Sequence, residues 1–149
     1  KMLKQNWISS TYTDLNLSID SPDALYRSPD STINKLTFIS SNKNLEINLI
    51  TKPIDENSDL SNELINDFKE RNFINVITKN EDFQTLDGDK GVKIFGSFDD
   101  QNLNRKKDYS TILFVVNKLS IKLEIIFERG NANLQKIVDR VINSLKFNK

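Results

Sequence analysis

The chain has 149 residues and equal numbers of basic and acidic side chains, 21 of each, and it contains neither histidine nor cysteine. Ser-His-Asp triads, Cys-His pairs and ordinary zinc or blue-copper sites are therefore excluded. The length fits one domain, the neutral charge argues against nucleic-acid binding, and no apolar run approaches the roughly 18–20 residues that span a bilayer.

The N-terminal part predicts an arm followed by a strand. We interpret residues 1–11 as a mainly polar arm that leads into a single domain spanning residues 12–149. Apolar and polar residues then alternate over residues 15–19, which is the period of a half-buried strand. Pro22 ends this strand because proline lacks the N–H that a sheet ladder needs.

A hairpin and a helix are predicted next. Residues 36–38 and 45–49 favour strands, and the polar residues between them favour a turn. Ser58 or Asp59 can cap a helix that ends near Asn72. The apolar stripe of this helix consists of Leu60, Leu64, Ile65 and Phe68.

The middle of the chain predicts further antiparallel strands. Residues 73–79 form one, and residues 82–86 extend the pairing. The composition of residues 87–91, Asp-Gly-Asp-Lys-Gly, is that of a turn. Gly96 occupies an inward position of the following strand, which predicts a bulge or the close approach of another element.

The clearest pattern is a C-terminal hairpin followed by an amphipathic helix. Residues 109–116 and 119–127 form two strands joined at Asn117 and Lys118, and the first strand is apolar on both faces, as a central strand is. The helix that follows has an apolar stripe of Leu134, Ile137, Val138, Val141, Ile142 and Leu145.

The order of the elements indicates the α+β class. Either Asn131 or Asn133 can cap the last helix. Runs of strands between two helices favour an antiparallel sheet of about six strands with helices packed on it, rather than an alternating parallel sheet.

Three stretches carry a family resemblance: the start from Trp7 and Tyr12 to Pro22, the turn and strand at residues 87–92, and the terminal hairpin with its helix, which ends at residues 143–147. They resemble the PsbP-like and Mog-like superfamily, which includes the DcrB-like bacterial lipoproteins. The resemblance implies an α/β/α sandwich. It also implies a binding or assembly role without a catalytic motif or a cofactor, as in photosystem subunits, Ran-binding factors and envelope lipoproteins. The missing histidines argue against a manganese role of the PsbP type.

Two groups of residues are candidate sites. Trp7, Tyr12 and Tyr26 are candidates for an aromatic ligand-binding surface, and the alternative is that they close the edge of the core. Asp87 and Asp89 offer carboxylates for Ca²⁺, but the closing Glu of an EF-hand loop of about twelve residues is missing, and turn chemistry explains both residues without a metal.

The other charged groups favour structural interpretations. Glu124 and Glu128 share one face of a strand about 13 Å apart, too far for a glycosidase pair at about 5–9.5 Å, so we expect a solvated sheet face or its margin. Lys122 is then their exposed ion partner. Residues 99–100 either join the calcium candidate or mark an exposed strand end, and basic residues 105–107 form a solvated loop tip.

We therefore expect a non-catalytic binding or assembly module of the bacterial cell envelope, periplasmic or lipid-anchored, whose partner is another protein or an envelope component. The alternatives are a cytoplasmic interaction factor of the Mog-like type, a carboxylate-based hydrolase and a calcium-dependent module. The start at Lys1 instead of Met is interpreted as a product of processing or trimming. A signal peptide with a cysteine just before Lys1 would favour the lipoprotein.

Overall fold

The structure, a computed structural model, describes residues 6–32, 34–54 and 59–148. The strands are β1 (Trp7–Tyr12), β2 (Leu17–Pro22), β3 (Tyr26–Arg27), β4 (Lys35–Ile39), β5 (Leu45–Pro53), β6 (Phe73–Gln84), β7 (Lys90–Asp100), β8 (Arg105–Val116), β9 (Leu119–Glu128) and β10 (Lys146–Phe147). The helices are the 3-10 turn η2 (Thr13–Leu15), α1 (Leu60–Glu70) and α2 (Ala132–Asn143).

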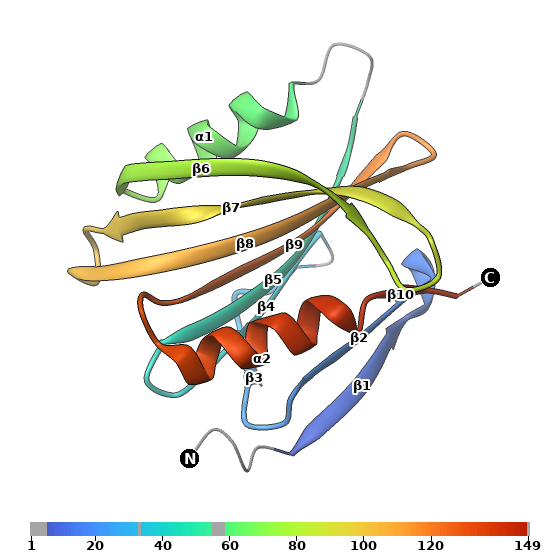
Figure 1. The fold of residues 1–149 in the computed structure, drawn as a ribbon, viewed down its shortest axis with the longest axis horizontal. Helices are drawn as coiled ribbons and strands as arrows, with labels where there is room; N and C mark the ends of the chain where they lie inside the picture. Colours follow the sequence, from blue (N-terminus) through green and yellow to red (C-terminus); the bar gives the residue numbers. More distant parts are fainter. Residues whose placement is uncertain (1–5, 33, 55–58, 149) are drawn as a thin grey trace.

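Two antiparallel sheets and two long helices form three layers (Figure 1). The large sheet has seven strands in the order β3-β4-β5-β9-β8-β7-β6, and the small sheet has three in the order β1-β2-β10. Helix α1 covers one face of the large sheet, whereas α2 and the small sheet cover the other. The predicted α+β class, with helices on both faces of an antiparallel sheet, is confirmed.

The N-terminal strand predicted at residues 15–19 does not join the large sheet, although the sequence predicts a single sheet. β2 pairs with β1 and β10 rather than with any strand of the large sheet. Residues 7–11, which the sequence assigns to an arm, form most of β1. The division into an arm and a domain at residue 12 stays a prediction.

Local turn and cap chemistry confirms several predicted boundaries. Asn117 and Lys118 both have positive φ, 50° and 62°, as a two-residue turn between right-twisted strands requires. Asp59 caps α1 and Asn131 caps α2, each through its side chain and a backbone N–H of the first turn. Ser58, the other predicted cap of α1, lies outside the described residues.

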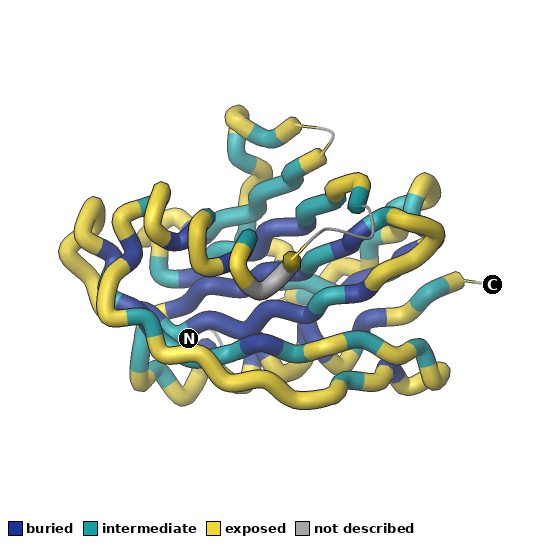
Figure 2. Tube along the Cα trace, turned by 90° about the horizontal axis from the view of Figure 1, so that it is seen from above, coloured by how far each residue is buried: buried dark blue, intermediate teal, exposed yellow. Residues whose placement is uncertain are grey.

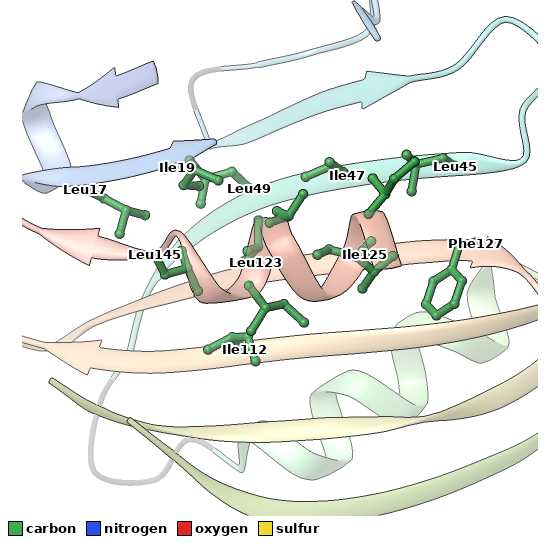
Figure 3. Packing of buried hydrophobic residues seen from close by; sticks show 14 of the residues in the cluster. Leu17, Ile19, Leu45, Ile47, Leu49, Ile112, Leu123, Ile125, Phe127 and Leu145 are labelled. Carbon is green, nitrogen blue, oxygen red and sulfur yellow. The ribbon is translucent and has the colours of Figure 1, made fainter. Parts of the chain in front are cut away.

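The main core lies between the large sheet and α2 (Figure 3), and the buried residues concentrate in the interior strands of the molecule (Figure 2). Leu123 and Ile125 of β9 face this helix, and Leu134 and Val138 are the helix residues buried most completely near its start. Leu17 of β2 belongs to the same cluster, so the small sheet and α2 share one core. The predicted placement of the terminal helix across the last hairpin is confirmed.

A second, aromatic cluster lies under α1. Phe68 of the helix contacts Phe98 of β7 and Tyr109 of β8, with ring centroids 5.3 and 5.0 Å apart. Phe73 stacks on Phe98 at 3.9 Å. These rings fix α1 over β6, β7 and β8, and Ile126 of β9 belongs to the same cluster.

The edge strand β6 carries the predicted irregularity. Its register shifts between Ile74 and Ile77, and a side chain at Gly96 would meet the Ile77 carbonyl, so the predicted close approach at Gly96 is confirmed. Residues 73–79 and 82–84 are parts of one continuous strand, so residues 82–84 extend the pairing as predicted, whereas Thr85 and Leu86 lie beyond the end of β6.

Candidate functional site

A groove of about 700 Å³ lies where the end of β1 meets the edge of the large sheet. Its walls come from η2, from the segment that follows β3 and from strands β4, β5 and β9. Ligand-binding clefts commonly have volumes of roughly 300–1,000 Å³, so this groove is large enough to be one.

Short local contacts shape the two walls of this groove. Asn16, with φ of 52°, turns the chain from η2 back into β2, a conformation that asparagine adopts more readily than most residues. On the other wall, the Thr37 N–H donates to Ser31 Oγ at 3.0 Å, and the Ser28 N–H donates to the Thr37 carbonyl at 2.8 Å. These bonds hold the segment after β3 against β4.

The groove combines an apolar floor with a polar rim. The floor consists of Leu15, Leu36, Leu49 and Leu119.

At the rim, burial raises the pKa of the Tyr12 hydroxyl, and the nearby charge of Arg27 acts against this rise. Neither Arg27 nor Asp14, also on the rim, forms an ion pair within the part of the chain that the structure describes. The groove can therefore receive an apolar side chain and pair charges of both signs at its edge.

The structure does not bring the three aromatic candidates together. Tyr12 lines the groove, whereas Trp7 lies at the other end of β1, with the Arg140 guanidinium 4.0 Å above its ring. Tyr26 is half exposed, and since neighbouring residues of a strand project to opposite faces, it points away from Arg27. The ligand-binding role of Trp7 and Tyr26 stays a prediction, separate from this groove.

The calcium candidates form a turn closed by a threonine. The Thr85 hydroxyl donates to the Asp89 carboxylate at 3.2 Å and accepts from the Asp89 N–H at 3.0 Å. Asp87 is exposed at the tip of this turn. Within the described ranges, no three acidic side chains are grouped as a metal site would require.

Residues 99–100 lie at the far end of β7 from that turn, and they are not the exposed strand end that the sequence predicts. Asp100 is 8% exposed, and its carboxylate accepts from the N–H groups of Asn102 and Leu103. A hydrogen bond from Asn75 and the contact with Arg129 lower the pKa of Asp99.

The solvent exposure predicted for Glu124 is the largest disagreement between the sequence-based prediction and the structure. It is 0% exposed, because α1 and the Arg71 that follows it cover this face of β9. Its Oε1 atom accepts hydrogen bonds from Arg71 Nη1 and from Asn48 Nδ2, both at 2.9 Å. The predicted solvated position is therefore wrong for Glu124, whereas Glu128 is exposed as expected.

The buried ion pair belongs to a polar row across the sheet. Thr37 donates to Asn48 at 2.7 Å, and Asn48 also donates to Glu46 at 2.7 Å. Burial alone would lower the pKa of Arg71, but the charges of Glu124 and Asp67 outweigh it, and the net pKa is raised. Lys122, expected to pair with the two glutamates, pairs with neither among the described residues.

The basic residues 105–107 are also more than a loop tip. Lys107 is 3% exposed and donates to the Lys43 carbonyl at 2.8 Å, and Arg105 donates to the Asn42 carbonyl at 2.8 Å. Burial lowers the pKa of Lys107. These two side chains join the β7–β8 turn to the β4–β5 turn, so the solvated interpretation is wrong for Lys107.

Comparisons with known proteins identify the fold. A scan of protein-family models finds no match, and a search of curated proteins finds none either. The solution structure of cyanobacterial PsbP (CyanoP) from Synechocystis sp. PCC 6803 superposes with a TM-score of 0.61 at 9% identity, covering 96% of this chain and 93% of that one. The crystal structure of the Saccharomyces cerevisiae Ran-binding protein Mog1p superposes with a TM-score of 0.62 at 11% identity, covering 97% and 96%.

A mutant of Mog1 gives a similar result, with a TM-score of 0.61 at 10% identity over 95% of this chain and 96% of that one. The chain therefore has the PsbP-like and Mog-like fold that its sequence pattern predicts. At these identities the likeness establishes the fold alone. No helix within the described ranges is both long and apolar enough to cross a bilayer.

Proposed function

We propose that this chain is a non-catalytic binding module that holds an extended segment of a partner protein in the groove beside Tyr12. The observation that carries the proposal is the composition of this groove. Its floor consists of four leucines, and its rim carries a cation, Arg27, and an anion, Asp14, neither of which forms an ion pair among the described residues. An apolar side chain of the partner fills the floor, and charged groups on either side of it pair with Arg27 and Asp14. The similar structure of Mog1p is that of a Ran-binding protein, which supports a protein as the partner.

The absence of histidine and cysteine supports a role without catalysis. A carboxylate-based hydrolase would need two acids free to exchange protons across a pocket. Two acids do line a cavity beside α1, but Glu63 pairs with Lys52 at 3.1 Å and Asp67 pairs with Arg71 at 2.9 Å. This pairing favours the binding module over the hydrolase.

The cell envelope is the proposed location, supported by the resemblance of the sequence pattern to the DcrB-like lipoproteins. The test is fractionation of the native host, followed by protease treatment of intact spheroplasts. Degradation of the protein by external protease is the expected result. Complete protection in the cytoplasmic fraction would favour the cytoplasmic factor of the Mog-like type instead.

In-cell photo-crosslinking tests the groove itself. A photoreactive amino acid replaces Thr13, an exposed residue of the groove wall, in the full-length protein in its native host. A second protein carries the same group at Lys136, which is exposed on α2 and outside the groove. We expect discrete protein adducts from the Thr13 position and none of the same size from the Lys136 position.

Charge reversal at the rim then shows whether these adducts depend on the groove. Arg27→Glu should lower the yield of the Thr13 adduct several-fold. An acidic group of the partner would then lose the cation with which it pairs, and it would be repelled by a second acid beside Asp14. Lys79→Glu, a matched reversal on the exposed strand β6, should leave it unchanged. The proposal is wrong if Thr13 gives no discrete adduct or if both reversals have the same effect.

A further inference from the structure

We propose that a second cavity, on the opposite face of the large sheet from the groove, binds a small hydroxy acid with a short aliphatic chain. The cavity has a volume of about 210 Å³ and lies between α1 and strands β4, β5, β7, β8 and β9. At about 30 Å³ per molecule, this space corresponds to about seven waters, or to a ligand of roughly seven to ten non-hydrogen atoms.

The walls of the cavity are partly aliphatic. Ile50, Leu64, Ile94 and Leu113 supply the apolar part, and the two acids that also line the cavity, Glu63 and Asp67, are paired with Lys52 and Arg71. The four aliphatic side chains come from β5, α1, β7 and β8, so a short methylene chain inserted here would contact apolar groups of both the helix and the sheet.

The mouth of the cavity carries two lysines, Lys35 and Lys122, that have no carboxylate partner in the described part of the chain. Lys52 also lines it, but Lys52 is paired with Glu63. Lys35 and Lys122 form no ion pair with any residue that the structure describes. Both are paired across the sheet with Ile50, so they lie on the same side of the sheet, on either side of that residue. This mouth is therefore suited to the carboxylate of the ligand.

The cavity is also lined by two hydroxyl groups, those of Thr111 and Ser120. Thr111 is 0% exposed, and its Oγ1 atom has no hydrogen-bond partner in the described part of the chain. Ser120 is 6% exposed as a residue, and its hydroxyl forms no hydrogen bond with any described residue. A buried polar atom without a partner is unfavourable, and a ligand hydroxyl would supply the missing hydrogen bond. A purely aliphatic acid would leave Thr111 unsatisfied, so we infer a ligand with a hydroxyl in addition to its carboxylate.

The immediate surroundings of Thr111 set the polarity of that contact. Thr111 is the direct cross-strand neighbour of Glu124, whose second carboxylate oxygen, Oε2, is also buried and has no hydrogen-bond partner among the described residues. A second carboxylate of a ligand would be repelled at this position. A neutral hydroxyl can instead donate to an acceptor oxygen here, which favours a hydroxy acid over a dicarboxylate.

Titration with 6-hydroxyhexanoate tests the proposal directly, using amide chemical shifts of the folded protein. Three analogues isolate each contact: hexanoate lacks the hydroxyl, 1,6-hexanediol lacks the charge, and adipate carries a carboxylate at both ends. We expect saturable shifts centred on Leu64, Thr111 and Ser120, with the tightest binding for 6-hydroxyhexanoate. Absence of saturable shifts for 6-hydroxyhexanoate, equal binding of hexanediol, or shifts confined to the groove beside Tyr12 would overturn the proposal.

Two substitutions separate the hydroxyl and carboxylate contacts. Thr111→Val keeps the shape of the side chain and should weaken 6-hydroxyhexanoate about three- to ten-fold while leaving hexanoate unchanged, since only a hydrogen bond is lost. Lys122→Met should weaken both acids by a similar factor but not hexanediol. Lys79→Met is the matched control on β6 and should change none of the affinities. If neither substitution discriminates among the ligands, the assignment is wrong.

Discussion

Removal of Arg71 should destabilise the fold far more than removal of an exposed lysine. Arg71→Met deletes the cation that faces Glu124, a carboxylate with 0% of its side chain exposed. The remaining donor to this carboxylate, Asn48, is neutral. A buried charge without a partner cannot recover its hydration, so the folded state carries most of the desolvation penalty.

The expected magnitude is about 3–5 kcal/mol of unfolding free energy, the range for breaking a buried pair by removing one partner. The cation–π contact of Arg71 with the Phe73 ring, at 4.7 Å, contributes about 0.5–1 kcal/mol within that range. For a chain of this size, about 2–4 °C per kcal/mol gives a fall in melting temperature of roughly 6–20 °C. Such a loss is large against a total stability of about 5–15 kcal/mol.

Urea unfolding followed by circular dichroism measures these differences. The control is Lys52→Met, which breaks the Lys52–Glu63 pair whose side chains are 56% and 37% exposed, and it should cost less than about 1 kcal/mol. Glu124→Gln added to Arg71→Met should restore stability, because it removes the charge that was left buried. Equal losses for Arg71→Met and Lys52→Met, or a double variant less stable than Arg71→Met alone, would refute the reasoning.

Three further outcomes are expected from other parts of the fold. Gly96→Ala should destabilise the protein by about 1–3 kcal/mol, because the added methyl group meets the Ile77 carbonyl, and a melting temperature equal to that of the wild type would contradict this. Asn131→Ala should cost about 1 kcal/mol in thermal unfolding, since the Leu134 N–H loses its 3.0 Å acceptor. Burial raises the pKa of Tyr109, so stability present below about pH 10 is lost as the pH rises through the folded-state pKa. Absorbance titration should show two tyrosines ionising late, Tyr12 and Tyr109, and Tyr109→Phe should remove one of these two steps.

The strands and helices with a regular hydrophobic pattern could be predicted, because the spacing of apolar residues within one element decides which of its faces is buried. The two-faced apolar strand at residues 109–116 must be central, and β8 indeed lies between β9 and β7. The stripe from Leu134 to Leu145 must face a core, and its members are buried. The prediction that Asn131 can cap the last helix is confirmed, because helix capping depends only on the residues of one helix turn.

The groove beside Tyr12 could be predicted only in part. Tyr12 is a candidate because it is an aromatic residue near the start of the domain, but three of the four leucines in the floor of the groove come from β4, β5 and β9. Each of these leucines has the ordinary pattern of a strand residue. Nothing in the local sequence distinguishes a leucine that lines a groove from one that is fully covered, because the difference depends on where the small sheet ends.

Glu124 shows why strand alternation misassigns a face that a distant helix covers. Polar residues at every second position of a strand indicate solvent only if nothing lies on that side. Here α1 and the Arg71 after it, more than fifty residues away in the chain, lie on it. One signal in the sequence argues against exposure: the facing strand β5 carries Asn48 in an apolar run, and Asn48 is buried opposite Glu124. Two polar residues in neighbouring central strands can form hydrogen bonds with each other. A pair of polar residues at matching register therefore indicates a buried hydrogen-bond network rather than a solvent-exposed face of the sheet.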